Sequence, residues 1–178
     1  MTAHLPSASP AVIRLTHFTE TELTEIAGEG EDAFGVAWTG LTWRAKQEHF
    51  GIERDGRLLA HTGLVTVPLC IGPVETRAVG FGGVIVAPGL RGQGLARSVV
   101  TAALEHARTL GPQYGLLFCR PHLVPFYGRL GWQRLTEDVE VEQPGDTSAV
   151  MPLETMWTPL REGAHWPAGP VRLRSLPM

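Results

Sequence analysis

The sequence predicts a mixed α/β fold within one domain, and two features carry this prediction. Residues 50–54 and 58–67 are strand-like runs joined by Asp55-Gly56, a pair that suits the positive φ angles of a tight hairpin turn. Residues 94–110 repeat apolar side chains at helical spacing and place charged side chains on the opposite face. Strand patterns and helix patterns alternate along the chain, which is typical of α/β proteins.

Each further element is predicted from its own local pattern. Thr19 and Glu22 form a capping-box signature, which predicts a helix from this point to about residue 27. Glycines at 80, 82 and 83 interrupt the strand predicted over 75–86, and glycines inside a strand indicate a bulge or the close approach of a ligand. The other expected elements are strands over 12–16, 115–119, 132–141 and 149–159, a loop over 29–40, short helices over 43–49 and 123–130, and an irregular C-terminal tail over 161–178.

The composition is that of an ordinary globular protein and excludes several classes of function. The chain has 178 residues, of which 43% are hydrophobic and 19% charged, so a single domain over 1–178 is expected. A net charge of −3 gives no attraction to nucleic acid or to an acidic membrane, and prolines interrupt the longest uncharged stretch, 58–74. Cys70 and Cys119 are isolated, which favours a reduced, cytoplasmic protein without a metal site. Residues 1–10 lack the features of a secretory signal and are expected to be a flexible lead-in.

Residues 84–97 combine a strand, a basic glycine loop and the start of a helix. The β-branched run that contains Val84, Ile85 and Val86 stops at Pro88-Gly89, and Arg91-Gly92-Gln93-Gly94 leads into the 94–110 helix. Glycines let a ligand approach the backbone closely, and the free amides and dipole of a helix N-terminus favour negative charge. The segment therefore predicts a binding site for a phosphorylated ligand.

Two common phosphate-binding motifs do not match this segment. A nucleotide P-loop requires Lys-Ser/Thr after its last glycine, whereas Leu95-Ala96 follows Gly94. A dinucleotide fingerprint requires a third glycine where Arg97 stands. Arg91-x-x-Gly94-x-Ala96 instead resembles the pyrophosphate-binding motif of the GNAT superfamily of N-acetyltransferases. A glycine-rich turn before an ordinary helix is the alternative interpretation of the same letters.

A second block of sequence decides between these interpretations. The apolar strand over 115–119 is followed by Phe126-Tyr127 and, after three residues, by Gly131-Trp132. This order resembles the second signature of the same superfamily, and the resemblance extends over about 12–159. It implies a sheet of six or seven mostly antiparallel strands that splays at its centre and is flanked by about four helices.

The resemblance also implies acetyl-CoA as cosubstrate, held between the strands that end at Val86 and Cys119. The pantetheine arm would hydrogen-bond to the backbone of Val84, Ile85 and Val86, much as an added strand would. The pyrophosphate would meet the loop and the first turn of the following helix. The residues expected there are Arg91, Gly92, Gln93, Gly94, Leu95, Ala96 and Arg97.

Transfer of acetyl to an amine requires a neutral amine, a stabilised oxyanion and a proton for the departing thiolate. Tyr127 stands where the general acid of the family lies, and a phenol with a pKa of about 10 is protonated at neutral pH. Packing beneath the cofactor is the structural alternative for this residue. A backbone N–H near Gly83 or Val84, turned inward by a bulge, is the expected oxyanion donor.

The general base is not singled out by the sequence. His122 comes just before the Tyr127 helix and is the preferred candidate. His61 lies in the middle of a strand, where a lone histidine usually has a structural role. Glu48 and His49 are expected to be solvated.

Three stretches, at 59–62, 77–86 and 127–132, resemble aminoglycoside 2′-N-acetyltransferases and their relatives. Those enzymes carry a glutamate at the position of Gly82. This chain therefore lacks a carboxylate that would bind a cationic amine. The expected function is acetyl-CoA-dependent N-acetylation of a small-molecule amine by direct attack in a ternary complex, with an aminoglycoside-like amine as one option. Protein or peptide N-acetylation and a non-catalytic acyl-CoA-binding regulatory module are the alternatives. Dimers are frequent in the family, so a homodimer is also left open.

Overall fold

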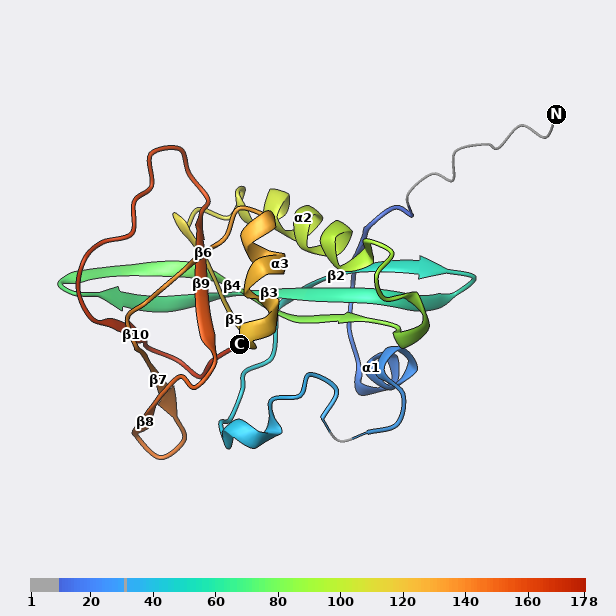
Figure 1. Cartoon of the computed structure of the whole chain (residues 1–178), viewed down its shortest axis with the longest axis horizontal. Coiled ribbons are helices and arrows are strands. Elements are labelled where there is room, and N and C mark those ends of the chain that lie inside the picture. The colour runs from blue at the N-terminus through green and yellow to red at the C-terminus, as the bar shows by residue number, and fades with distance from the viewer. Residues whose placement is uncertain (1–9, 31) are drawn as a thin grey trace.

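The computed structural model describes residues 10–30 and 32–178; the predicted lead-in therefore lies almost wholly outside the described residues. Within those ranges, ten strands form one mixed sheet, eight of them in the order β6-β9-β5-β4-β3-β10-β7-β8, and β2 and β1 continue from β3 on a second path (Figure 1). The strands are β1 (Ile13–Leu15), β2 (Glu48–Arg54), β3 (Arg57–Ile71), β4 (Val74–Val86), β5 (Tyr114–Cys119), β6 (Gln133–Arg134), β7 (Val139–Gln143), β8 (Thr147–Val150), β9 (Glu154–Pro159) and β10 (Val171–Leu173).

Three α-helices in the described ranges flank this sheet: α1 (Glu20–Ala27), α2 (Leu95–Ala107) and α3 (Val124–Arg129). Short 3-10 turns, η1 (Ala37–Thr39), η2 (Pro88–Leu90) and η3 (Pro121–Leu123), lie in the connections. In Figure 1 α2 lies above the long strands β2, β3 and β4, and α1 lies below them. The buried residues agree, because Val99 and Ala103 of α2 belong to the largest apolar cluster whereas Ile26 of α1 belongs to a separate one.

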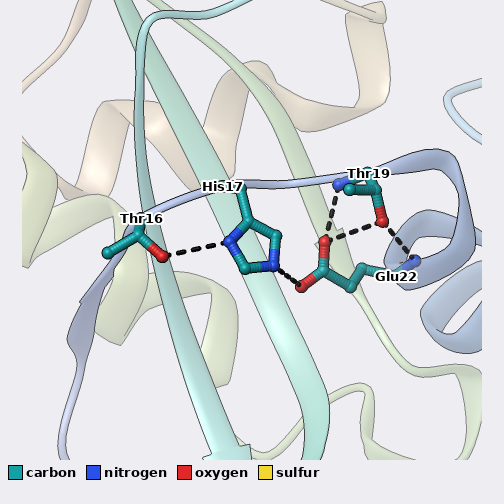
Figure 2. A network of polar contacts seen from close by, with 4 residues as sticks. All are labelled: Thr16, His17, Thr19 and Glu22. Carbon is teal, nitrogen blue, oxygen red and sulfur yellow. Dashed lines mark hydrogen bonds and ion pairs between the residues drawn. The ribbon is translucent and has the colours of Figure 1, made fainter.

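The N-terminus of α1 is built by the predicted capping box (Figure 2). The Thr19 backbone N–H donates to Glu22 Oε2 at 2.6 Å, and the Glu22 N–H donates to Thr19 Oγ1 at 3.4 Å. His17 Nε2 lies 3.5 Å from the other carboxylate oxygen of Glu22, and its Nδ1 is 3.0 Å from Thr16 Oγ1. The hydrogen bonds from Thr19 lower the pKa of Glu22. These contacts hold the chain between β1 and α1 in one path.

The hairpin and the central helix follow the sequence pattern closely. Asp55 and Gly56 have φ angles of 52° and 74° and connect β2 to β3, as the turn signal predicted. The alternating burial of β3 is broken near its centre by a run of buried residues, because both faces of the sheet are covered there. The α/β class is confirmed, and the sheet opens at its centre because the β4–β5 pairing stops at Phe81 and Leu117; the described residues form more strands and fewer helices than expected.

The segment 43–49 is not the predicted helix. Its backbone donors are bound to other elements: the Arg44 N–H donates to the Pro177 carbonyl at 2.8 Å and the Gln47 N–H to the Leu64 carbonyl at 2.8 Å. A helix would have required these N–H groups for its own ladder. The segment instead runs as extended chain into β2, which begins at Glu48.

The C-terminal third also departs from the sequence prediction. The sequence predicted two closing strands, but the structure has four in this region. β6 pairs with β9 near one edge of the sheet, and β7 pairs with β8 and β10 near the other. The tail, expected to be irregular, contributes β10, which inserts between β3 and β7 with Val171 and Leu173 buried. A buried-exposed-buried triplet is too short a signal to be recognised as a strand from sequence alone.

None of the helices in the described ranges is both long enough and apolar enough to cross a membrane.

Candidate functional site

The centre of the sheet opens between β4 and β5. These two parallel strands pair only from Ala78 with Tyr114 to Phe81 with Leu117. Beyond that point β4 keeps its pairing with β3 as far as Val86, and β5 keeps its pairing with β9 as far as Cys119. The β5-facing edge of β4 from Gly82 onward is therefore without a strand partner. A cavity of about 970 Å³ lies at this divergence.

The unpaired edge of β4 carries a bulge. His61 pairs with Ile85 and Gly63 with Gly82, so β4 has one residue more than β3 across this interval. Gly83 has a φ of 62°, a conformation that L side chains rarely adopt. The three glycines predicted either a bulge or the close approach of a ligand, and a bulge near Gly83 or Val84 was expected with the oxyanion donor; the register shows a bulge at this place.

His61 holds the bulge in place. Its Nδ1 lies 2.7 Å from the Gly83 carbonyl oxygen, and its Nε2 lies 3.0 Å from Nδ1 of His49. Because a carbonyl only accepts, a neutral His61 carries its proton on Nδ1, and His49 then donates to Nε2. Phe18 stacks on the His61 ring at a centroid distance of 3.6 Å. Burial lowers the pKa of His61 from 6.5 to about 4, so the ring is neutral at pH 7.

Glu48 and His49 are not the solvated pair that the sequence suggested. Both are half-buried in β2. Glu48 Oε2 lies 2.6 Å from Nε2 of His106 in α2, and Oε1 lies 3.1 Å from Arg14. His49 lines the cavity, and burial lowers its pKa. Local sequence patterns do not predict these contacts, because they depend on how β1, β3 and α2 lie against β2.

The glycine loop after β4 leads into α2 as predicted. Gly92 and Gly94 have φ angles of 79° and 82°, and Gly94 is the N-cap of α2 without a side-chain hydrogen bond to the first turn. Main-chain donors of that turn thus remain open for a ligand. Ser98 bonds back to the Gly94 carbonyl through its backbone N–H at 3.1 Å.

The structure separates the predicted cofactor residues into three groups. Val84, Ile85, Val86, Arg91 and Ala96 line the cavity. Gly92, Gln93, Gly94 and Arg97 are exposed at the N-terminus of α2, and Leu95 is buried in the core. The Arg91 side chain lies across the end of β4, where its Nε donates to the Val86 carbonyl at 3.4 Å. Arg91 and Ala96, on either side of the glycines, thus line the cavity together with the edge of β4.

Tyr127 and His122 come from the segment that follows β5. Tyr127, in α3, is 6% exposed and lines the cavity, and its ring packs edge-on against Phe126 and Trp132. Burial, and to a lesser degree the neighbouring Cys119, raises the pKa of Tyr127 above its usual 10. Burial likewise raises the pKa of Cys119 to about 11, so both groups are protonated at pH 7. His122, in η3, is exposed at the rim of the cavity.

The loop between α1 and β2 covers the other side of the cavity. Asp32 accepts hydrogen bonds from the backbone N–H groups of Val36 and Ala37, at 2.8 and 3.0 Å, and these bonds lower its pKa. Arg120, at the end of β5, donates to the Phe34 carbonyl at 3.0 Å. Any side chain at Gly35 would overlap the Arg120 guanidinium, so this contact is a tight one. Arg120 therefore fastens the loop to the opened end of β5.

Lys46 lines the cavity and was not among the predicted site residues. Its aliphatic chain lies over Gly63 and Gly82. A Cβ atom at Gly63 would lie 2.5 Å from Lys46 Cγ, and a Cβ atom at Gly82 would lie 2.6 Å from Lys46 Cε. Partial burial, together with Arg44, lowers the pKa of Lys46 from 10.5 to about 8. The one available signal was that Lys46 is the only lysine in the chain.

The sequence matches the model of the acetyltransferase (GNAT) domain family over residues 15–135, and the chain belongs to this family of acyltransferases. A GNAT family N-acetyltransferase from Escherichia coli, solved in complex with CoA, is 19% identical, with a TM-score of 0.58 over 96% of this chain and 94% of that one. A GNAT family acetyltransferase from Brucella melitensis, solved with acetyl-CoA, is also 19% identical, with a TM-score of 0.54 over 92% and 96% of the two chains. Both share the fold. No curated protein matches the sequence.

Proposed function

We propose that the protein transfers the acetyl group of acetyl-CoA to a primary amine of a small molecule, by direct attack in a ternary complex. One observation carries the proposal: the unpaired edge of β4 at Gly82–Val86 is followed, after η2 and the glycine loop, by the N-terminus of α2, which has no side-chain cap. A pantetheine arm has amides that can bond to such an edge, and a pyrophosphate suits the helix start. The ligands of the similar structures from E. coli and Brucella melitensis, CoA and acetyl-CoA, support this choice of cosubstrate.

The chemistry assigns a role to each side of the opening. The neutral amine attacks the thioester carbonyl carbon, and a backbone N–H of the Gly83-Val84 bulge donates to the oxyanion that forms. The C–N bond is made, the C–S bond breaks, and the sulfur leaves as a thiolate. Tyr127 gives its proton to that thiolate. With pKa values of at least about 10 for the phenol and about 8.5 for the thiol, this transfer is uphill by about 2 kcal/mol or more, which a turnover barrier accommodates.

The amine must lose a proton, and His122 at the rim is the candidate that accepts it. His61 is unsuited to this role because both of its ring nitrogens are engaged, one with Gly83 and the other with His49. His61 instead fixes the bulge that presents the oxyanion donor. Positioning of the two reactants supplies the remaining rate enhancement.

The contact between Arg120 and Phe34 supports a small acceptor over a polypeptide, because it ties the covering loop to β5 beside the opening. An aminoglycoside-like amine stays one option within this class. The test is a thiol-release assay with acetyl-CoA against polyamines, aminoglycosides, arylalkylamines and amino acids. Release with one class of small amine is the expected result. Binding of acetyl-CoA without release for any amine would favour the non-catalytic module, and release only with peptides would favour protein acetylation.

A further inference from the structure

His49 of β2 ends a chain of hydrogen bonds that begins at the bulge of β4. The Gly83 carbonyl accepts from His61 Nδ1 at 2.7 Å, and His61 Nε2 lies 3.0 Å from His49 Nδ1. Since the first bond fixes the proton of neutral His61 on Nδ1, its Nε2 can only accept, and His49 must donate from its own Nδ1. The tautomer of a neutral His49 is thereby fixed, with a lone pair and no proton on Nε2.

This second nitrogen of His49 is open to a ligand. Among the residues that the structure describes, the contact with His61 is the one hydrogen bond of the His49 side chain. The ring lines the same cavity as Val84 and Tyr127. Burial lowers the pKa of His49, so the ring is neutral at pH 7. A neutral imidazole that presents an unengaged lone pair to a cavity can accept a proton there.

The charged groups around His49 come from several parts of the chain. Lys46 lowers its pKa in addition to burial, and Glu22 of α1 raises it. The carboxyl end of the chain at Met178 lies beside Lys46, because its carbonyl carbon and Lys46 Nζ are 3.1 and 3.0 Å from the position that a Cβ of Gly82 would occupy. A positive charge formed on His49 would therefore meet negative charge on α1 and over β4 as well as the lysine.

The other end of the hydrogen-bond chain is the peptide bond between Gly83 and Val84. This peptide is trans, so the Val84 N–H points away from the carbonyl oxygen that His61 binds. Hydrogen bonds in a chain polarise one another, so a peptide whose carbonyl accepts a bond donates more strongly from its N–H. The Val84 N–H belongs to the bulge of the proposed oxyanion donor. His49 and that donor are therefore the two ends of one polarisable chain.

Acetylation of an ammonium group requires two protons to leave its nitrogen. The first leaves before attack, when the ammonium becomes a neutral amine, and His122 at the rim serves this step. The second leaves the cationic nitrogen of the tetrahedral adduct. That adduct exists only where the thioester lies, so the second proton needs an acceptor inside the cavity.

We propose that His49 is this acceptor: its Nε2 takes the second proton of the amine, directly or through one water, and His61 couples the resulting charge to the oxyanion donor. One N–H bond of the adduct breaks, its electron pair stays on the substrate nitrogen, and a new N–H bond forms on the imidazole. The C–S bond then breaks and Tyr127 protonates the sulfur. Transfer of the proton from His49 to the tyrosinate through water restores both groups.

This inference rests on the proposed acetyl transfer and adds two residues to it. His49 would be a catalytic residue, because it meets the reacting nitrogen. His61 would be a positioning residue that acts through the Gly83 carbonyl.

The test measures thiol release with the most active amine for the wild type, His49→Gln, His61→Gln, the double variant and His165→Gln. Glutamine keeps an N–H that can donate to His61 but has no basic nitrogen. His165 is an exposed histidine that is not among the residues lining the cavity, and it serves as the matched control. Calorimetry with CoA verifies that each variant is folded and binds the cosubstrate.

His49→Gln should lower kcat by about 10²-fold, as loss of a general base does, with little change in the KM for acetyl-CoA. The kcat of the wild type should fall at a pH below the usual 6.5 of a histidine, where His49 takes a proton, and His49→Gln should lack this fall. In the double variant the two losses should combine to less than their product, because both act through one chain. Imidazole added to His49→Ala should restore part of the rate, and His165→Gln should match the wild type.

An unchanged kcat in His49→Gln, or an acidic limb that survives in it, would overturn the assignment of His49 while leaving acetyl transfer intact. A loss that imidazole does not restore in His49→Ala would also overturn it, because the ring would then only support its neighbours. Losses that multiply in the double variant would overturn the coupling through His61. Absence of thiol release with every amine would instead refute the proposed function, and this inference with it.

Discussion

The buried His61 gives a prediction about stability against pH. Its pKa in the folded protein is about 4, against 6.5 for the free side chain. Between these two pH values the unfolded chain binds a proton at His61 and the folded protein does not. The contribution of His61 to the free energy of unfolding is therefore fully present above pH 6.5 and is lost as the pH falls towards 4. The difference of about 2.5 pH units corresponds to about 3 kcal/mol in all, of which about 2 kcal/mol is lost between pH 7 and pH 5.

The assay is urea unfolding at pH 7, 6 and 5, with wild type and His61→Gln measured side by side. Glutamine keeps an N–H that can donate to the Gly83 carbonyl, and it does not titrate. Other titrating groups are common to both proteins, so they cancel in the comparison. The wild type should lose about 2 kcal/mol more than the variant between pH 7 and pH 5. Parallel pH dependences would refute the assignment of His61 as a neutral, buried support of the bulge.

Three further predictions concern the opening itself. Tyr127→Phe should lower kcat for acetyl transfer by about 10²-fold or more with a smaller effect on the KM for acetyl-CoA, as removal of a general acid does, and unchanged turnover would exclude Tyr127 from the chemistry. Gly94→Ala should destabilise the protein by about 1–2 kcal/mol, because Gly94 has a positive φ, and should weaken CoA binding. The matched Gly89→Ala variant, changed at an open position without positive φ, should keep both its stability and its CoA affinity, as measured by urea unfolding and calorimetry. Cys119, with its pKa raised to about 11, should react with iodoacetamide at pH 7.5 far more slowly than free cysteine, and rapid labelling tracked by mass spectrometry would contradict its burial in the wall.

Features set by a few neighbouring residues could be predicted from the sequence. The capping box at Thr19 and Glu22, the Asp55-Gly56 turn and the amphipathic pattern of α2 each depend on contacts within one or two turns of chain. The bulge was predictable for the same reason, because a left-handed φ at Gly83 is a local property. The strand, glycine loop and helix start of residues 84–97 were predictable for the same reason.

Features set by distant partners could not be predicted. β10 is a strand because Val171 pairs with Ile71, about a hundred residues earlier, and with Val139. The 43–49 segment is extended because its donors bind residues of the tail and of β3. His49 meets His61 only through the β2–β3 register, and Lys46 enters the cavity only because two glycines face each other across strands. Sequence periodicity carries no record of such pairings.

The central claim is that the divergence of β4 from β5 binds acyl-CoA through main-chain groups. A titration of the 15N-labelled protein with CoA, followed by backbone amide NMR, tests it most directly. The largest shifts are predicted for the amides of Val84, Val86, Gly92 and Gly94, with the β2–β3 turn at Asp55 unaffected. Saturating CoA that leaves the amides of residues 84–96 unshifted, or that shifts a different surface, would contradict the account.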